Sequence, residues 1–209
     1  MKKLLILLFS VFFLYSPSVF ADDISDFEIE GMSIGDSLLD YMTEDEILKE
    51  IEANRNLYYY LNEPNKYVEV YVLKDFPTYD MVSVFVKNNS LNLYVTNSNE
   101  KYTILSIRGM MPYIQDFDSC IKKRDEIAEV LSGMFPNSYK SESRLVHPAD
   151  PSGNSITDHI TFDFDSGEVA DIHCSNWDEN YRIKYNYKEG LTIQLLSKDV
   201  SAWMRDRDY

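Results

Sequence analysis

The chain has 209 residues and a formal net charge of −15, with 35 Asp and Glu against 20 Lys and Arg. Phosphate backbones and anionic membrane surfaces repel protein surfaces of this sign, which argues against nucleic-acid and lipid partners. Its length can bury a sizeable core in one domain, and two small subdomains are the alternative.

The first 21 residues have the three parts of a secretory signal peptide. Two lysines form a positive start, an apolar stretch follows over residues 4–15, and Ala21 occupies the position before a cleavage site. The apolar stretch is too short to span a membrane. We therefore expect cleavage after residues 1–21 and an exported protein, periplasmic or secreted, with no membrane insertion after cleavage. Residues 22–209 are expected to form a single α+β domain.

The first half of this domain is predicted to contain one main helix and four strands. Thr43 and Glu46 have the capping-box pattern, which starts a helix ending near Asn54. Before it, Phe27 and Ile29 alternate as in a short edge strand, and a brief helix is expected at 36–41. The predicted strands cover residues 66–72, 82–86, 91–95 and 102–108, with an Asn88-Asn89 turn pairing the second strand with the third.

The second half repeats this order with one more strand. A helix is predicted to begin at Asp116 or Asp118, to bury Cys120 and Leu131 on one face, and to stop at Gly133. A short terminal helix near residues 199–205 is expected to dock through its apolar side chains, Val200 and Trp203. The predicted strands cover residues 139–146, 156–164, 169–175, 181–187 and 191–196, the last two joined as a hairpin.

The predicted fold class is α+β, with antiparallel β-meanders and two main α-helices packed on the sheet. Because the order of helix and strands recurs, the domain has a second interpretation as two helix-plus-meander halves, about 36–110 and 116–198. No motif string is shared between the two halves.

The stretch Phe27–Tyr41, FEIEGMSIGDSLLDY, resembles the N-terminus of uncharacterised small exported bacterial proteins. Its Gly31-Met32-Ser33 run is also similar to the helical start of outer-membrane assembly lipoproteins and β-lactamase-inhibitor-like modules. In those families such a run precedes helices lying on an antiparallel sheet. The lipid-bearing cysteine of the lipoproteins is absent here. The resemblance implies a binding or interaction role and no catalytic residue.

Residues 158–175 read as a β-hairpin with one apolar and one polar face. A three-residue turn at Ser166–Glu168 would set Phe162 opposite Ile172 and Ile160 opposite Cys174, which places the apolar side chains together. A two-residue loop would mix apolar and charged groups on both faces. The first register is therefore favoured, and it leaves the following residues on the outer face: His159, Thr161, Asp163, Asp171, His173 and Ser175.

The only two cysteines, Cys120 and Cys174, both fall on predicted inner faces. In an oxidising compartment such an even pair favours a disulfide joining the second helix to the hairpin. The alternative is two separate buried thiols.

The outer face of the hairpin carries the candidate metal ligands His159, Asp163, Asp171 and His173. Imidazole and carboxylate groups converging over two strands are typical of a zinc-type site, and a cation would relieve the repulsion between facing aspartates. The alternative is an ordinary solvated sheet face.

We expect a non-catalytic module of the cell envelope that binds an unknown protein or a small ligand and requires no cofactor. The alternative is a metal-binding protein or a metal-dependent hydrolase that uses the outer face of the hairpin. The sequence has none of the common short motifs of hydrolases, zinc proteases or phosphate-binding loops.

Overall fold

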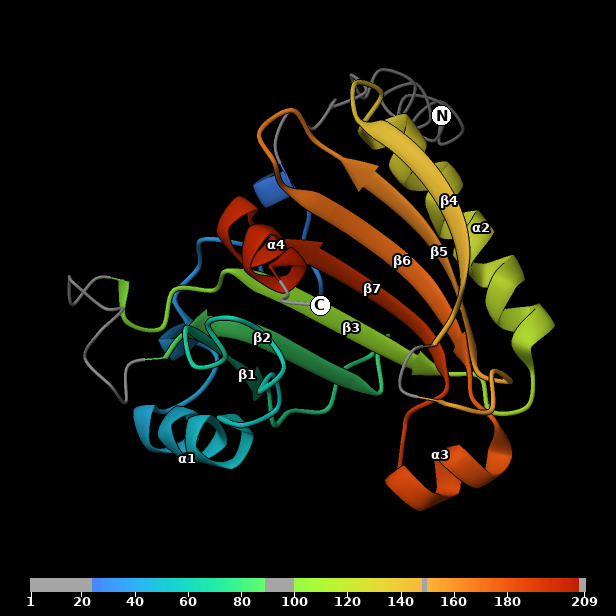
Figure 1. Cartoon of the computed structure of the whole chain (residues 1–209). Helices are drawn as coiled ribbons and strands as arrows, with labels where there is room; N and C mark the ends of the chain where they lie inside the picture. The colour runs from blue at the N-terminus through green and yellow to red at the C-terminus, as the bar shows by residue number, and fades with distance from the viewer. Residues whose placement is uncertain (1–23, 89–99, 148–149, 207–209) are drawn as a thin grey trace, which may run out of the picture.

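The computed structural model describes residues 24–88, 100–147 and 150–206 (Figure 1). The predicted signal peptide, residues 1–21, and the predicted strand 91–95 lie outside the described residues. In the described part of the chain, no helix is long and apolar enough to cross a membrane.

The fold is mixed α/β and consists mostly of one seven-stranded sheet within the described residues. Every neighbouring pair of strands is antiparallel. The order is β1-β2-β3-β7-β6-β5-β4, so the last strand of each half of the chain lies at the centre. The strands are β1 (Tyr67–Tyr71), β2 (Met81–Lys87), β3 (Ser106–Pro112), β4 (Tyr139–Val146), β5 (Ile156–Asp163), β6 (Val169–Asn176) and β7 (Gly190–Leu196).

Local capping defines where the helices begin. In α1 (Glu44–Asn54), the Glu46 amide donates to the Thr43 hydroxyl and the Thr43 amide donates to the Glu46 carboxylate, which confirms the predicted capping box. Asp116 caps α2 (Phe117–Met134) by accepting from the Ser119 amide. The remaining helices are α3 (Glu179–Tyr185), α4 (Lys198–Arg205) and the short 3-10 turns η1 (Ile24–Asp26) and η2 (Leu38–Asp40).

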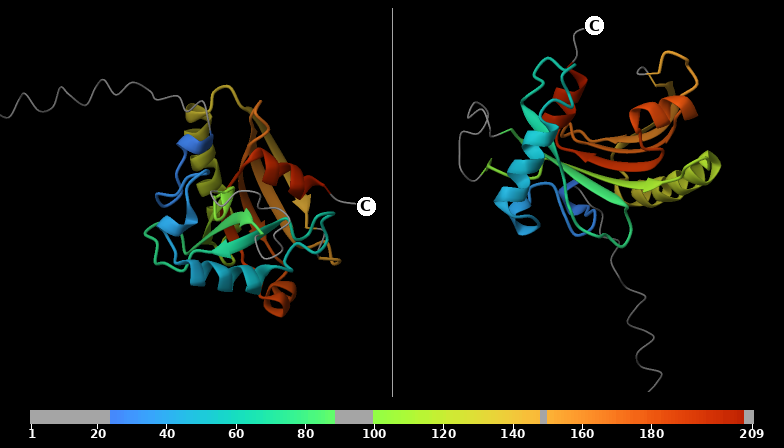
Figure 2. Two further views of the ribbon diagram at one scale, coloured as in Figure 1. Left: turned by 90° about the vertical axis from the view of Figure 1, so that its left-hand side faces the viewer. Right: turned by 90° about the horizontal axis from the view of Figure 1, so that it is seen from below.

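The inner face of the sheet packs against α1 and α2, which lie on one side of it (Figure 2). The alternating valines of β1 and β2 and the apolar residues of β5, β6 and β7 form this core. The lead-in before α1 also belongs to it, because Ile24, Ile29, Met32 and Leu38 are fully buried or nearly so. The expected edge strand there is reduced to a single bridge between Ile29 and Met32.

On the opposite, outer face, α4 covers the end of the sheet formed by β1 and β2 (Figure 2). Val200 and Trp203 pack there with Tyr67 and Phe85, as predicted for the terminal helix. The Trp203 indole also donates a hydrogen bond to the Glu63 carbonyl at 2.6 Å. α4 packs on the β1–β2 end of the sheet and not on the outer face of β5 and β6.

Two predicted hairpins are wrong for the same physical reason. Residues 181–187 were expected to pair with β7 as a strand, but they fall largely in α3, which Asp178 caps through the amides of Asn180 and Tyr181. Both edges of β7 are already paired, with β3 and with β6. Likewise, β2 pairs with β1 and β3, so the predicted pairing of strand 82–86 with 91–95 has no free edge.

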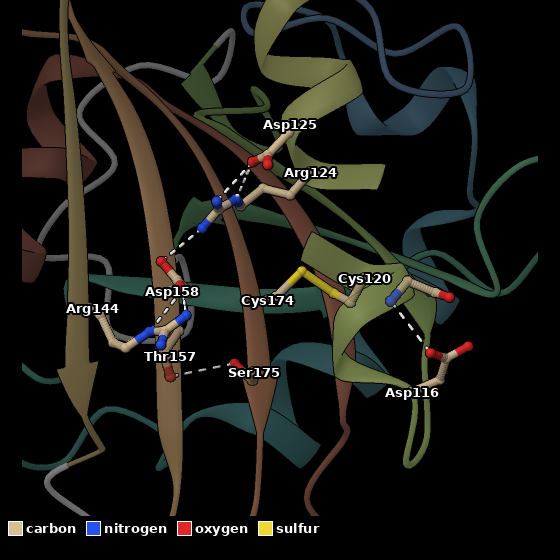
Figure 3. Close-up of a disulfide and its surroundings, with 10 residues drawn as sticks. Asp116, Cys120, Arg124, Asp125, Arg144, Thr157, Asp158, Cys174 and Ser175 are labelled. Carbon is tan, nitrogen blue, oxygen red and sulfur yellow. Dashed lines mark hydrogen bonds and ion pairs between the residues drawn. A yellow bond between two sulfur atoms is a disulfide. The ribbon is translucent and has the colours of Figure 1, made fainter. Parts of the chain in front are cut away.

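The predicted disulfide between Cys120 and Cys174 is confirmed (Figure 3). It joins α2 to β6 over a Cα–Cα distance of 6.0 Å, and both residues are fully buried. Next to it lies a partly buried ion-pair cluster that no local sequence pattern indicated. Asp158 of β5 accepts hydrogen bonds from Arg124 of α2 at 2.7 Å and from Arg144 of β4 at 2.8 Å.

Candidate metal centre

The register of the β5–β6 hairpin differs from the predicted one by two residues. Phe162 lies opposite Ala170, and Ile160 lies opposite Ile172. The turn has the expected length but is centred one residue earlier, because the Phe164 amide donates to the Glu168 carbonyl at 3.1 Å and encloses residues 165–167. Gly167 occupies the left-handed region within this loop, with φ +93°. Since a shift of two keeps each side chain on its face, the predicted inner and outer faces are retained.

The shift changes which side chains face each other on the outer face. His159 lies directly opposite His173, where the expected partner was Ser175. Asp171 lies opposite Thr161, and Asp163 lies opposite Val169 at the end of the ladder. The expected Asp163–Asp171 pair is therefore wrong. The structure brings three of the four predicted ligands together and leaves Asp163 outside that group.

In this group, both imidazoles converge on one carboxylate. His159 Nδ1 lies 2.9 Å from Asp171 Oδ1, and His173 Nδ1 lies 2.5 Å from Asp171 Oδ2. The two rings are neighbours, with centroids 4.8 Å apart. The side chains of His159 and His173 remain 23% and 17% exposed, while that of Asp171 is 11% exposed. The Asp171 carboxylate is thus more buried than the two imidazole rings, which lie closer to the protein surface.

The electrostatics keep this carboxylate ionised. Burial disfavours its charged form, but the positive charge and hydrogen bonds of His173 and His159 outweigh burial and hold the pKa of Asp171 well below its usual range. Asp171 can therefore act as an acceptor for two N–H groups at once. This arrangement fixes the tautomer of a neutral imidazole, because the proton is held on Nδ1 and the lone pair is left on Nε2.

The donor set suits a zinc-type ion. One ligand atom from each of His159, Asp171 and His173 lies within 4.8 Å of the other two. With metal–ligand distances of about 2.0–2.2 Å, tetrahedral ligand atoms lie roughly 3.3–3.5 Å apart, so the side chains would adjust from their present hydrogen-bonded contacts to hold an ion.

The third histidine lies near this group, which the sequence did not indicate. His147 follows β4, and its amide donates to the Ser155 carbonyl at 2.8 Å. Burial lowers the pKa of His147, and positive charge on His173 and His159 lowers it further. His147 packs against Trp177 with ring centroids 4.2 Å apart and the two rings tilted by 47°.

A row of polar side chains crosses the outer face with one residue on each strand. Asp171 pairs in register with Gln194 of β7, and Gln194 pairs with Arg108 of β3. Arg108 in turn donates to the buried Glu69 at 2.9 Å. In register order the row is Tyr71, Ser83, Arg108, Gln194, Asp171, Thr161 and Ser141.

Comparison with protein-family models, with curated proteins and with solved structures finds no match for this chain. The resemblance of its N-terminal segment to exported proteins and envelope modules therefore stays an expectation.

Proposed function

We propose that this chain is an exported binding protein of the cell envelope and that its ligand is a transition-metal ion of the Zn²⁺ type. The observation that carries the proposal is the convergence of two partly exposed imidazoles, His159 and His173, on the single carboxylate of Asp171. The Cys120–Cys174 disulfide supports the export of the protein, because such bonds persist in oxidising compartments.

Metal binding explains the arrangement better than solubility does. A solvated sheet face needs charged groups, but it does not need an aspartate buried beneath two histidines from neighbouring strands. Imidazole and carboxylate ligands favour Zn²⁺ and its neighbours in the first transition row over Mg²⁺, which prefers oxygen ligands alone. The rival explanation is that the two histidines serve only to neutralise and hydrogen-bond Asp171.

Thermal unfolding of the purified protein, freed of metal with EDTA and dialysed, separates the two explanations. A ligand that binds only the folded state stabilises it by about 2.7 kcal/mol at 100 times its Kd. We expect Zn²⁺ to raise Tm in a saturable way, Mg²⁺ to have no effect, and His173→Ala and His159→Ala each to weaken Zn²⁺ binding in calorimetry by at least about tenfold.

Asp163→Asn is the matched control, because Asp163 lies on the same face of the same strand as His159 but outside the cluster. We expect this variant to bind Zn²⁺ like the wild type. Equal Zn²⁺ responses in the wild type and in the doubly substituted His159→Ala/His173→Ala protein would overturn the proposal, as would no response in the wild type.

A metal-dependent hydrolase is the second candidate function. Three protein ligands leave one tetrahedral position open, as in catalytic zinc sites, whereas structural zinc sites use four. A hydrolytic activity on chromogenic ester or phosphodiester substrates that EDTA removes, Zn²⁺ restores and His173→Ala abolishes would favour this candidate over simple binding.

A further inference from the structure

A pocket of about 440 Å³ opens between the ends of β2 and β3 and the α3 segment. Its apolar lining includes Met81 of β2, Met110 of β3 and Ile114 after β3. Met81 and Met110 are cross-strand partners, and both are partly exposed. Pockets of this size with an apolar lining and a few polar groups are typical of small-ligand sites, and methionine adapts to irregular apolar shapes.

The wall of this pocket is held rigid by packing outside it. Tyr187 lines the pocket and stacks on Trp177, with ring centroids 4.3 Å apart. The Trp177 indole donates to the Lys188 carbonyl at 2.9 Å, which fixes the neighbouring backbone. Gly190 ends the segment at φ +142°, where a Cβ would overlap the Met111 carbonyl oxygen. A pocket preformed in this way loses little conformational entropy when a ligand binds.

Charged groups of both signs stand around the apolar floor. Arg182 of α3 lines the pocket, and its Nε lies 3.3 Å from the carboxylate of Glu189, which is 5% exposed. Burial raises the pKa of Glu189, and the charge of Arg182 opposes that rise. Glu189 thereby orients the guanidinium, and among the described residues it is the only ion-pair partner of Arg182. The terminal nitrogens of the guanidinium are then available to a carboxylate.

An acidic side chain lines the same pocket from another element. Asp80 precedes β2, and its amide donates to the Met110 carbonyl at 3.0 Å, which holds its backbone beside the floor. Among the described residues, its carboxylate has no ion-pair partner. Lys188 lines the pocket as a second cation. The pocket therefore presents a guanidinium oriented by Glu189, an apolar floor and the carboxylate of Asp80.

We propose that this pocket binds a short zwitterionic peptide with apolar side chains. The peptide carboxylate pairs with Arg182, its ammonium group pairs with Asp80, and its side chains lie on Met81 and Met110. The proposal uses none of the three residues of the metal centre, so it stands independently of the proposed function.

Calorimetry with L-leucyl-L-phenylalanine tests the proposal, with the N-acetylated and C-terminally amidated forms as matched ligands. We expect the wild type to bind the free dipeptide, and each blocked form to bind at least about tenfold more weakly, since each lacks one charged contact. EDTA should leave the affinity unchanged, which separates this site from the metal centre.

Two variants assign the contacts. We expect Arg182→Gln to weaken binding of the free dipeptide and to make the affinities for the free and amidated forms equal. Asp80→Asn, at an exposed position, should erase the difference between the free and acetylated forms without affecting folding. Lys184→Gln, on α3 outside the pocket lining, is the control and should bind like the wild type. Equal binding of all three ligands by the wild type, or no binding of the free dipeptide, would overturn the proposal.

Discussion

The two faces of the β5–β6 hairpin carry different kinds of residues although they share the same backbone. On the inner face, Ile160, Phe162, Ala170, Ile172 and Cys174 are at most 2% exposed, and they pack into the core that α2 covers. On the outer face, the same strands present polar side chains, including the candidate metal ligands. The covered face buries apolar side chains and so contributes hydrophobic stabilisation, whereas the outer face of this hairpin carries polar side chains that are partly exposed.

One polar side chain breaks this division. Asp158 points to the inner side, near the disulfide, and is 9% exposed (Figure 3). Its carboxylate is satisfied by Arg124 and Arg144, which come from α2 and β4. At this position the inner face accommodates a charge because two cations from neighbouring elements compensate it.

Removal of the disulfide should have the largest effect on stability, because it joins the covered face to its helix. The crosslink closes a loop with a sequence separation of 54 residues. On the chain-entropy model this contributes about 4 kcal/mol to the free energy of unfolding. We expect the Cys120→Ser/Cys174→Ser protein to lose about that amount in urea unfolding. The wild type in dithiothreitol should show a similar loss, and an unchanged midpoint in both would contradict the role given to the crosslink.

A pair of substitutions at adjacent positions of β5 compares the two faces directly. Ile160→Ala removes a core side chain that is 2% exposed, and we expect a loss of roughly 3 kcal/mol in the free energy of unfolding. Thr161→Ala on the outer face removes only a partly buried hydrogen bond to Ser141, with an expected cost of about 0.5–1 kcal/mol. Equal losses in urea unfolding would mean that the outer face is packed as the inner face is.

The Asp158 cluster predicts a smaller loss and a dependence on pH. Burial disfavours the ionised carboxyl, but hydrogen bonds from Arg144 and Arg124 outweigh burial and lower the pKa of Asp158 below 3.8. A carboxyl whose pKa is lowered by folding stabilises the protein above its unfolded pKa, and this stabilisation is lost as the pH falls through the folded pKa.

We therefore expect Asp158→Asn to destabilise the protein by about 2 kcal/mol at pH 7, less than is usual for a fully buried pair because Arg144 is largely exposed. The difference between wild type and variant should shrink as the pH is lowered below 3.8. Urea unfolding at a series of pH values measures it. A difference that stays constant down to the acid limit would show that the charge of Asp158 does not contribute.

Much of this fold could be predicted from the sequence because its signals are local. The capping box at Thr43 needs only residues within one turn, and the alternation in β5 and β6 needs only each strand itself. Pairing the two cysteines required only their count and their predicted faces. These features hold whatever the neighbouring elements are, so the sequence predicted them correctly.

The errors concern which strand lies beside which. The alternating residues Ile183, Tyr185 and Tyr187 have the period of a strand, but the first two lie in α3 and Tyr187 follows it, because β3 occupies the edge of β7 that they would have used. The interpretation of the two halves as a duplication stays a prediction.

The sequence by itself determined the two faces of the hairpin, the disulfide and the residue types available for a metal site. Only the tertiary structure decided that His159 faces His173 and that both reach Asp171, because a shift of two residues preserves the faces and changes every partner. The same holds for the peptide pocket, where Asp80 and Arg182 are separated by about half of the chain. Their meeting depends on the central pairing of β3 with β7, a long-range contact that no local pattern encodes.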